Sequence, residues 1–368
     1  MPTQLDHYVT LGRSGLRVSP LCLGAMTFGE EWGFGVGPEE SGKLMNRYLE
    51  AGGNFIDTAN IYNKGHSEQI MGDYFAAKGG GPGNKFPARD RVVIATKWLG
   101  NMYPGDPNGG GAHRKALMES VDQSLRRLQT DYIDLLWLHF WDAHTPIDET
   151  MRGLDTLVNS GKVRYIGFSD TPAWKCAQAQ MIAEFRGWSP LIALQIEYSL
   201  LERTVEGELI PMAKELGMGV TPWSPLKGGI LTGKYTRDSM PDRGRYKQDS
   251  RYLNDRTFAI VDEMASIAGR HECTVPEVAL AWVRQQSGVQ STIIGARTME
   301  QLAGNLRSLQ VELSEKELTS LAELSAPTLP FPHDFLGNIG VGIQNGTTVN
   351  GVSADPWGGG PADDGERW

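Results

Sequence analysis

The stretch "NFIDTANIY", residues 54–62, decides the fold class because it is one unit of a repeated pattern. It begins as a short apolar run typical of a buried strand. It then places an acid, Asp57, and a phenol, Tyr62, five positions apart. On either side, further short apolar and β-branched runs alternate with longer segments in which apolar residues recur at helical spacing.

Eight such strand candidates occur, and each is followed by helical sequence. Repeated β–α units indicate a parallel sheet. Eight units in a chain of 368 residues fit a closed (β/α)₈ TIM barrel better than an open sheet. The eight candidates are "PLCLGAM", "NFIDTA", "RVVIATK", "YIDLLWLH", "VRYIGFS", "LIALQIEYS", "MGVTPWSP" and "STIIGA".

The segments around this barrel complete the predicted organisation. The opening "YVTLGRSGLRVSP", residues 8–20, indicates a β-hairpin that plugs the barrel floor. The segment 227–254, after the seventh strand, is longer than an ordinary βα loop, and long loops are usually functional. We predict a barrel over residues 1–325 and a Gly- and Pro-rich extension over 326–368, either mobile or a lid over a site. Phe331, Phe335 and Trp357 give a lid something to bury.

Composition restricts the class of protein. Hydrophobic residues make up 40% and charged residues 21%, which is ordinary for a globular protein. The formal net charge of −9 argues against a nucleic-acid surface. The three cysteines are widely spaced without metal-ligand spacing, and no apolar run is long enough to span a membrane. With no secretory signal pattern in "MPTQLDHYVTLG", the cytoplasm is the expected location, and no membrane or nucleic-acid partner is expected.

Three consecutive strand candidates end in polar residues that could share one rim. The second ends at Asp57 with Tyr62 beyond it, the third at Lys97 and the fourth at His139. Each residue alone has a common structural role, such as a loop acceptor, a solvated amine, a core histidine or a packing phenol. In a TIM barrel, however, catalytic groups gather at the carboxyl ends of the strands. Their joint occurrence therefore favours a catalytic site.

The four side chains suit the chemistry of a carbonyl group. A tyrosine hydroxyl is a poor acid at neutral pH, and a neighbouring lysine is expected to lower its pKa by roughly 1–3 units. Asp57 would hold and neutralise Lys97, and His139 could donate a hydrogen bond to a substrate oxygen. No nucleophile or metal set accompanies them, so something else must attack the carbonyl.

These motifs resemble the aldo-keto reductase family, in the branch with aryl-alcohol dehydrogenases and potassium-channel β subunits. "GxNFIDTAxxY", "ATK" and "DYIDLLWLH" recur in family order, and the likeness covers residues 11–324. The resemblance implies hydride transfer from a nicotinamide cofactor. It places the four catalytic positions on Asp57, Tyr62, Lys97 and His139, with Tyr62 as general acid in reduction and base in oxidation.

A dinucleotide would bind through the last barrel loops. No G-x-G-x-x-G opens a helix, and "GGGPGNKFP", residues 79–87, lacks the ending of a phosphate loop. The resemblance implies that Trp223, in place of Tyr or Phe, stacks on the nicotinamide. Asp170 stands where the family has Asn, and Arg297 would favour NADPH over NADH by binding the 2′-phosphate. The full implied set for NADP(H) is Ser169, Asp170, Gln195, Trp223, Ser224, Leu226, Gly228, Gly229, Gly295, Arg297, Gln301 and Asn305, with no metal.

The substrate is expected to be an aldehyde or ketone, or an alcohol in the reverse direction. Four aromatic residues either line its pocket or belong to the core: Trp32, Trp98, Phe140 and Trp141. Two alternatives remain, a nucleotide-binding redox-sensing subunit with slow turnover and a Schiff-base lyase using Lys97. The sequence leaves the identity of the substrate, the physiological direction and the oligomeric state open.

Overall fold

The computed structural model describes residues 3–78, 88–237, 240–241, 245–247, 249–361 and 363–367, and of these the side chains of 338 and 340–342 are not described. The segment "GGGPGNKFP" and parts of the loop after the seventh strand lie outside the described residues. The chain divides into two compact units, Met1–Ser325 and Ala326–Trp368.

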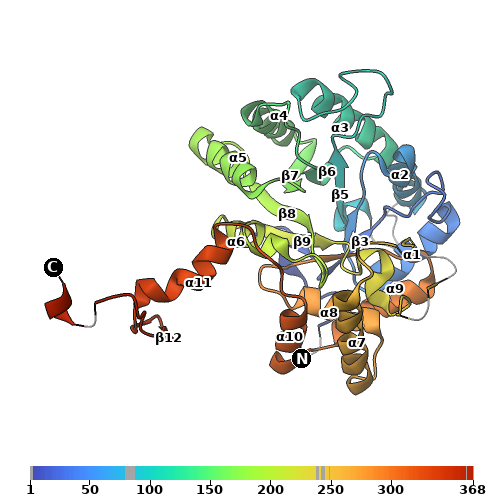
Figure 1. Ribbon diagram of the computed structural model, residues 1–368. Coiled ribbons are helices and arrows are strands. Elements are labelled where there is room, and N and C mark those ends of the chain that lie inside the picture. Colours follow the sequence, from blue (N-terminus) through green and yellow to red (C-terminus); the bar gives the residue numbers. More distant parts are fainter. Residues whose placement is uncertain are drawn as a thin grey trace. The chain divides into compact units, whose positions relative to one another are not determined.

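The first unit contains the predicted barrel (Figure 1). All eight central strands are parallel, in the order β10-β3-β4-β5-β6-β7-β8-β9. The circle closes where the Val220 amide donates to the Gly288 carbonyl at 3.2 Å and the Gln290 amide donates to the Val220 carbonyl at 3.0 Å. The strands are β3 (Leu21–Gly24), β4 (Phe55–Asp57), β5 (Val93–Trp98), β6 (Ile133–Leu138), β7 (Val163–Ser169), β8 (Leu191–Glu197), β9 (Gly219–Trp223) and β10 (Thr292–Ile294).

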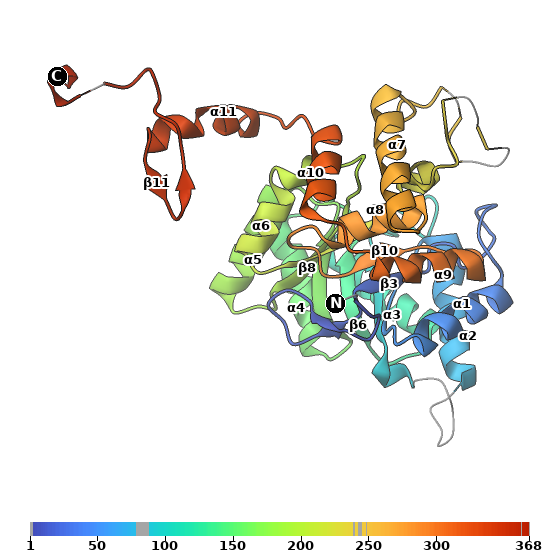
Figure 2. The same cartoon turned by 90° about the horizontal axis from the view of Figure 1, so that it is seen from below.

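Helices surround the strands, as the two orientations in Figures 1 and 2 show. The amphipathic pattern explains their packing, since in α3 the apolar residues Leu117, Val121 and Leu128 are all buried. The sequence also marks helix starts, because Ser314 and Glu317 form a capping box at α10. The helices are α1 (Pro38–Glu50), α2 (His66–Lys78), α3 (Arg114–Leu128), α4 (Ile147–Asn159), α5 (Ala173–Arg186), α6 (Leu209–Glu215), α7 (Asp255–Arg270), α8 (Val275–Arg284), α9 (Met299–Arg307) and α10 (Glu315–Leu324).

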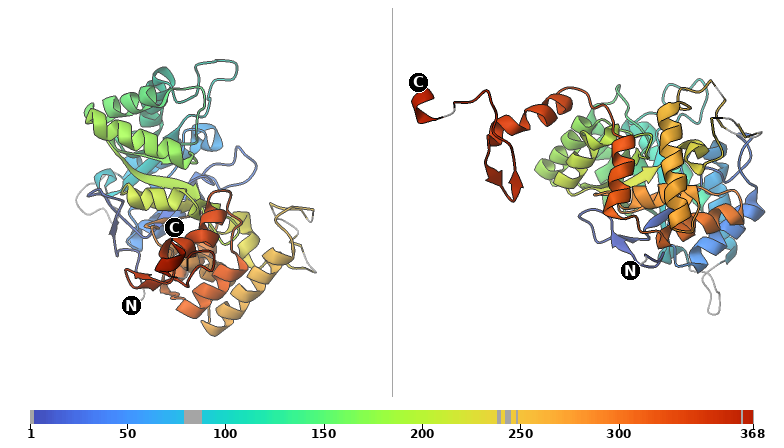
Figure 3. Two further views of the ribbon diagram at one scale, coloured as in Figure 1. Left: turned by 60° about the vertical axis from the view of Figure 1, so that its left-hand side comes forward. Right: turned by 60° about the horizontal axis from the view of Figure 1, so that its bottom comes forward.

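The barrel interior is a packed apolar core at its amino-terminal end. The hairpin β1 (Val9–Thr10) and β2 (Arg17–Val18) contributes Leu11 and Val18 to this core, as expected of a plug. Inward side chains from the strands fill the rest: Cys22, Phe55, Val93, Ala95, Leu135, Trp137 and Ala193. Alternate residues of each strand point into the barrel. The apolar ones fill its amino-terminal end, and the inward residues at the carboxyl-terminal ends of the strands can be polar. A larger apolar layer lies between the strands and the helices, and Figure 3 gives two further views of the helices around the sheet.

The second unit, Ala326–Trp368, contains α11 (His333–Gln344) and the short hairpin β11 (Thr348–Val349) and β12 (Val352–Ser353). Phe331, Phe335 and Trp357 are exposed. The lid role remains a prediction. No helix within the described part of the chain has both the length and the apolarity to cross a membrane.

Candidate active site

The end of β4 meets the end of β5 in a buried ion pair. Lys97 follows Val93 and Ala95 on the inward face of β5, and the side chains of Asp57 and Lys97 are 3% and 1% exposed. The Lys97 ammonium donates to Asp57 Oδ1 and to the Thr58 carbonyl at 2.8 Å. Gln195 Nε2, from the end of β8, donates to Asp57 Oδ2 at 2.9 Å. Both carboxylate oxygens are thus satisfied, as a buried charge requires.

Tyr62 begins the short 3₁₀ turn Tyr62–Gly65 and lies above this pair. The Lys97 Nζ atom is 4.7 Å from the centre of the phenol ring. The Tyr62 ring meets the His139 imidazole edge to face at a centroid distance of 5.7 Å, and the Trp32 indole at 5.9 Å. The structure therefore brings together the four residues predicted from three strand ends.

The pKa of Tyr62 corrects one expectation. Burial raises this pKa above its ordinary value. The Lys97 charge acts to lower it, as expected, but burial and the Asp57 charge outweigh the lysine. At neutral pH the phenol therefore keeps its proton, which it could donate to a developing alkoxide.

The pKa values of Lys97 and His139 move in opposite directions. Burial acts to lower the pKa of Lys97, but attraction to Asp57 and Tyr62, with hydrogen bonds to both, leaves it raised, so the ammonium stays charged. Burial, with a smaller contribution from the Lys97 charge, lowers the pKa of His139 to about 3. His139 is thus a neutral imidazole at pH 7, able to donate one N–H. Its Nδ1 atom is buried with no hydrogen-bond partner among the described residues.

The residues suggested for the nicotinamide lie on the next strand ends around the same rim. Ser169 ends β7 and is buried. Asp170 follows it, and its Oδ1 accepts a hydrogen bond from Trp223 Nε1 at 3.0 Å. Trp223 ends β9, so Ser169, Gln195 and Trp223 lie on the consecutive strands β7, β8 and β9, and Gln195 contacts Asp57.

The loop after β9 contains the Gly228–Gly229 pair within the 3₁₀ segment Lys227–Thr232, which follows Ser224 and Leu226. Both glycines have positive φ, of 58° and 97°. A Cβ on Gly228 would lie 2.9 Å from the Tyr246 ring, so only glycine fits there. A Cβ on Gly229 would lie 2.8 Å from Lys234 Nζ, so both glycines let side chains of this loop pack closely against the backbone.

The loop after β10 leads into α9 and carries the residues suggested for the adenosine end. The Arg297 amide donates to Gln301 Oε1 at 2.8 Å, and Asn305 Nδ2 donates to the Gly295 carbonyl at 3.1 Å. Among the described residues, and apart from its chain neighbours, no heavy atom lies within 4 Å of the position a Cβ on Gly295 would take. Within the described residues, the structure records no hydrogen bond or ion pair for the Arg297 guanidinium.

The four aromatic residues suggested for the substrate separate into two groups. Trp32 and Phe140 are exposed, Trp141 is half-buried, and the Phe140 ring lies 5.5 Å from His139. Trp98 is 1% exposed and packs in the layer between strands and helices. Since it follows the inward Lys97, its side chain points outward from the barrel. The sequence left open whether Trp98 lines the substrate pocket or belongs to the core, and in the structure it belongs to the core.

Two further features were not anticipated from the sequence. Asn63 Nδ2 donates to the Met26 and Phe28 carbonyls at 3.0 Å each, and its Oδ1 accepts from the Trp32 amide at 3.2 Å. This residue therefore ties the loop that carries Trp32 to the turn that carries Tyr62. The φ of Asn63 is 47°, a left-handed value that asparagine adopts more readily than most residues. An asparagine in this loop is the one feature of the sequence that could have suggested such a turn.

The second feature holds the loop after β9 in place. Lys227 Nζ lies 2.7 Å from Glu197 Oε1, at the end of β8, and 4.7 Å from the Tyr252 ring centre. The Lys227 side chain is only 4% exposed. The sequence offers no cue for this pairing because the partners are far apart in the chain.

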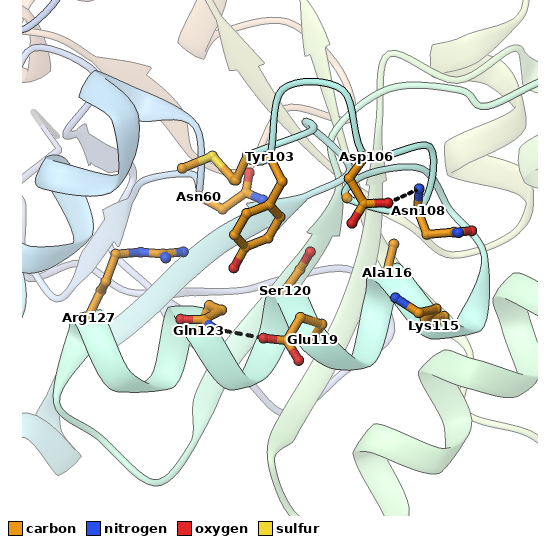
Figure 4. Close-up of a pocket in the computed structure, with 12 residues that line it drawn as sticks. Asn60, Tyr103, Asp106, Asn108, Lys115, Ala116, Glu119, Ser120, Gln123 and Arg127 are labelled. Carbon is orange, nitrogen blue, oxygen red and sulfur yellow. Dashed lines mark hydrogen bonds between the residues drawn. The ribbon is translucent and has the colours of Figure 1, made fainter.

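A separate small cavity of about 50 Å³ lies outside the barrel, between the loop after β5 and α3 (Figure 4). Asn60, Tyr103, Ser120 and Arg127 are among its lining residues. The Asn60 amide is buried and has no partner for either polar atom among the described residues. No residue predicted for catalysis or cofactor binding lines it. No cluster of three or more metal-ligating residues occurs in the described chain either.

The sequence matches known proteins over most of its length. A model of the aldo/keto reductase family matches residues 20–326. An aryl-alcohol dehydrogenase of Pestalotiopsis microspora is 36% identical, covering 90% of this chain and 85% of its own. A norsolorinic acid reductase of Emericella nidulans is 35% identical, and the match covers 90% of this chain and 84% of the reductase. An uncharacterized oxidoreductase of Bacillus subtilis is 38% identical, covering 86% and 95%.

Proposed function

Because the chain belongs to the aldo/keto reductase family, we propose that it interconverts an aldehyde or ketone and its alcohol using NADP(H). An oxidoreductase acting on carbonyl or alcohol substrates follows from the family and from the names of its relatives. The observation that carries the finer proposal is the arrangement of Tyr62, His139 and the Asp57–Lys97 pair around one point of the rim.

The loops at this rim fit a dinucleotide. Gly228 and Gly229 are half-buried at positive φ, and backbone amides without a side chain of their own would suit contact with a pyrophosphate. The Arg297 guanidinium is available for a 2′-phosphate at the start of α9, and a helix N-terminus favours an anion. Ser169 and Gln195 would hold the nicotinamide carboxamide, and the Trp223 indole would stack on the ring. When bound, the cofactor supplies or accepts the hydride.

In this mechanism Tyr62 delivers the proton. The phenol holds its proton at neutral pH because it is buried, and Lys97 beneath it stabilises the phenolate left after donation. Asp57 fixes the ammonium, which also donates to the Thr58 carbonyl, and Gln195 donates to the second carboxylate oxygen of Asp57. Neutral His139 would donate to the substrate oxygen and align the carbonyl with the Tyr62 hydroxyl. In the oxidative direction Tyr62 would act as the base: once the phenol has lost its proton to water, the phenolate, stabilised by Lys97, would accept the alcohol proton.

An aryl carbonyl or alcohol is the substrate class we favour. The exposed Trp32 packs against Tyr62 and the exposed Phe140 against His139, and the half-buried Trp141 follows Phe140 in the chain. Aromatic rings pack favourably against one another. The names of two relatives, an aryl-alcohol dehydrogenase and a norsolorinic acid reductase, agree with this class.

The structure gives the lyase alternative no support. A Schiff-base lysine needs a lowered pKa, whereas Lys97 has a raised pKa and a carboxylate partner. Against the redox-sensing alternative, the four side chains proposed for catalysis lie together at the rim, as turnover would require. Steady-state consumption of NADPH against a panel of aryl aldehydes, ketones and aliphatic carbonyls tests the proposal. Turnover with aryl compounds is expected, and tight NADPH binding without turnover on any of them would favour the sensor.

A further inference from the structure

Asp170 and Trp223 form a hydrogen-bonded pair across the rim. They follow β7 and end β9, which β8 separates, and Trp223 Nε1 donates to Asp170 Oδ1 at 3.0 Å. An indole N–H is only a donor, and this carboxylate is its acceptor. These are also the two positions at which the sequence departs from the pattern it resembles. The structure shows that the two departures are in contact.

The backbone fixes the direction of the Asp170 side chain. Its φ is 38°, in the left-handed region that few non-glycine residues adopt. The Asp170 amide donates to the Gln195 carbonyl at 3.1 Å, and its own carbonyl accepts from the Trp141 amide at 3.3 Å. A residue held by two neighbouring segments in a strained conformation is typical of a functional position.

Asp170 differs from two other carboxylates of this rim, which pair with cations. Asp57 pairs with Lys97, and Glu197 pairs with Lys227. Asp170 contacts the neutral indole, and within the described residues no salt bridge is recorded for it. The charged groups that act on it are Glu197, which raises its pKa, and Lys97, which lowers it.

Desolvation is the largest effect on the carboxyl group and raises its pKa to about 6. Water still reaches the side chain at the mouth of the barrel, and a ligand that covered it would strengthen the desolvation. At pH 7.5 the group is therefore an anion, and near pH 5 it is largely protonated.

We propose that Asp170 is a positioning residue that orients the Trp223 indole, and that its negative charge makes the site prefer the oxidised, positively charged nicotinamide over the reduced, neutral one. This rests on the proposed function, which places the nicotinamide ring on Trp223. A carboxylate close to the ring attracts only the cationic form. The neutral Asp57–Lys97 and Glu197–Lys227 pairs leave that attraction uncancelled.

Asp170→Asn separates the two roles because its amide oxygen still accepts from the indole but carries no charge. We would measure the dissociation constants of NADP⁺ and NADPH by fluorescence titration at pH 7.5 and pH 5. The preference of the wild type for NADP⁺ is expected to fall by about fivefold or more in the variant at pH 7.5. At pH 5 the wild-type preference should approach that of the variant, whose own preference stays constant. An unchanged preference in Asp170→Asn at pH 7.5 would overturn the charge role.

Asp170→Leu and Trp223→Phe test the positioning role. Asp170→Leu should weaken NADPH binding, whereas Asp170→Asn should retain it. In a Trp223→Phe background, Asp170→Leu should change NADPH affinity no further. Additive losses would contradict positioning through the indole. Failure of the wild type to bind either NADP⁺ or NADPH would contradict the proposed function, on which this inference rests. Circular dichroism would identify any variant that does not fold.

Discussion

The Tyr62 ring meets the His139 imidazole edge to face at 5.7 Å, although the two residues follow different strands and belong to different loops. The phenol keeps its proton and the imidazole is neutral, so both can donate toward a single oxygen. Lys97 lies beneath the phenol ring and provides the positive charge for its conjugate base. This relationship is the basis of the predictions that follow.

Removing the phenol hydroxyl tests the proton donor. Tyr62→Phe keeps the ring contacts with His139 and Trp32, so NADPH binding should change little. Turnover should fall on the order of 10²-fold or more, because general acid catalysis is lost. Stopped-flow measurement of NADPH oxidation, with binding followed by fluorescence, provides both values. Full turnover in this variant would remove Tyr62 from the mechanism.

Breaking the buried ion pair tests its structural role. Lys97→Met leaves the Asp57 carboxylate buried without its cation and should lower the free energy of unfolding by about 3 kcal/mol. The double variant Asp57→Asn/Lys97→Met removes both charges and should recover much of that loss. Urea denaturation measures both. A double variant no more stable than Lys97→Met would show that the unpaired charge is not the cause.

Asn63 is predicted to hold the loop that carries Trp32, which we propose forms one wall of the substrate pocket. Asn63→Gly accepts the positive φ but loses the three hydrogen bonds to the loop that carries Trp32. We expect KM for an aryl substrate to rise severalfold while kcat changes less, because the Tyr62 turn keeps its own contacts. Asn63→Ala serves as the comparison, since it adds backbone strain to the same loss and should be less stable. Equal proportional effects on KM and kcat would contradict a role confined to the wall.

Arg297 is predicted to select the phosphorylated cofactor. Arg297→Ala should weaken NADPH binding by about 10- to 100-fold, the value of a charge-assisted hydrogen bond, and leave NADH binding nearly unchanged. Calorimetric titration of both nucleotides measures the difference. Arg186→Ala, at the exposed end of α5, is the matched control for loss of one positive charge. Equal losses for NADPH and NADH would remove the 2′-phosphate assignment.

His139 should make the fold sensitive to acid. Its pKa is about 3 in the folded protein and near 6.5 when unfolded, so the unfolded chain binds the extra proton between these values. Stability should therefore be unaffected by this group above pH 6.5 and should fall as the pH drops toward 3. Between pH 7 and pH 5, His139→Gln should lose about 1–2 kcal/mol less than the wild type in denaturant titrations. His144→Gln, at an exposed site, is the control, and the same slope in all three proteins would contradict the prediction.

The fold followed from local patterns that need no long-range information. Each barrel strand is an apolar run, and many of the surrounding helices, α3 and α4 among them, have a clear amphipathic period, so the repeat and its closure could be predicted. The location of Asp57, Lys97 and His139 followed as well, because strand ends in a parallel barrel share one rim.

Side-chain environments could not be predicted in the same way. The pKa of Tyr62 depends on how deeply the phenol is buried, and Trp98 points outward only because Lys97 points inward. The pairs Asp170–Trp223 and Lys227–Glu197 join residues of different strands and loops. Such contacts are set by tertiary packing, and one sequence carries no record of them.

A crystal structure with NADP⁺ bound tests the central claim most directly, by measuring where the nicotinamide ring lies relative to Tyr62. The ring is expected to stack on the Trp223 indole, with its carboxamide at Ser169 and Gln195 and the Tyr62 hydroxyl facing the reacting carbon. A nucleotide bound elsewhere, or a Tyr62 hydroxyl turned away from both the ring and Lys97, would contradict it.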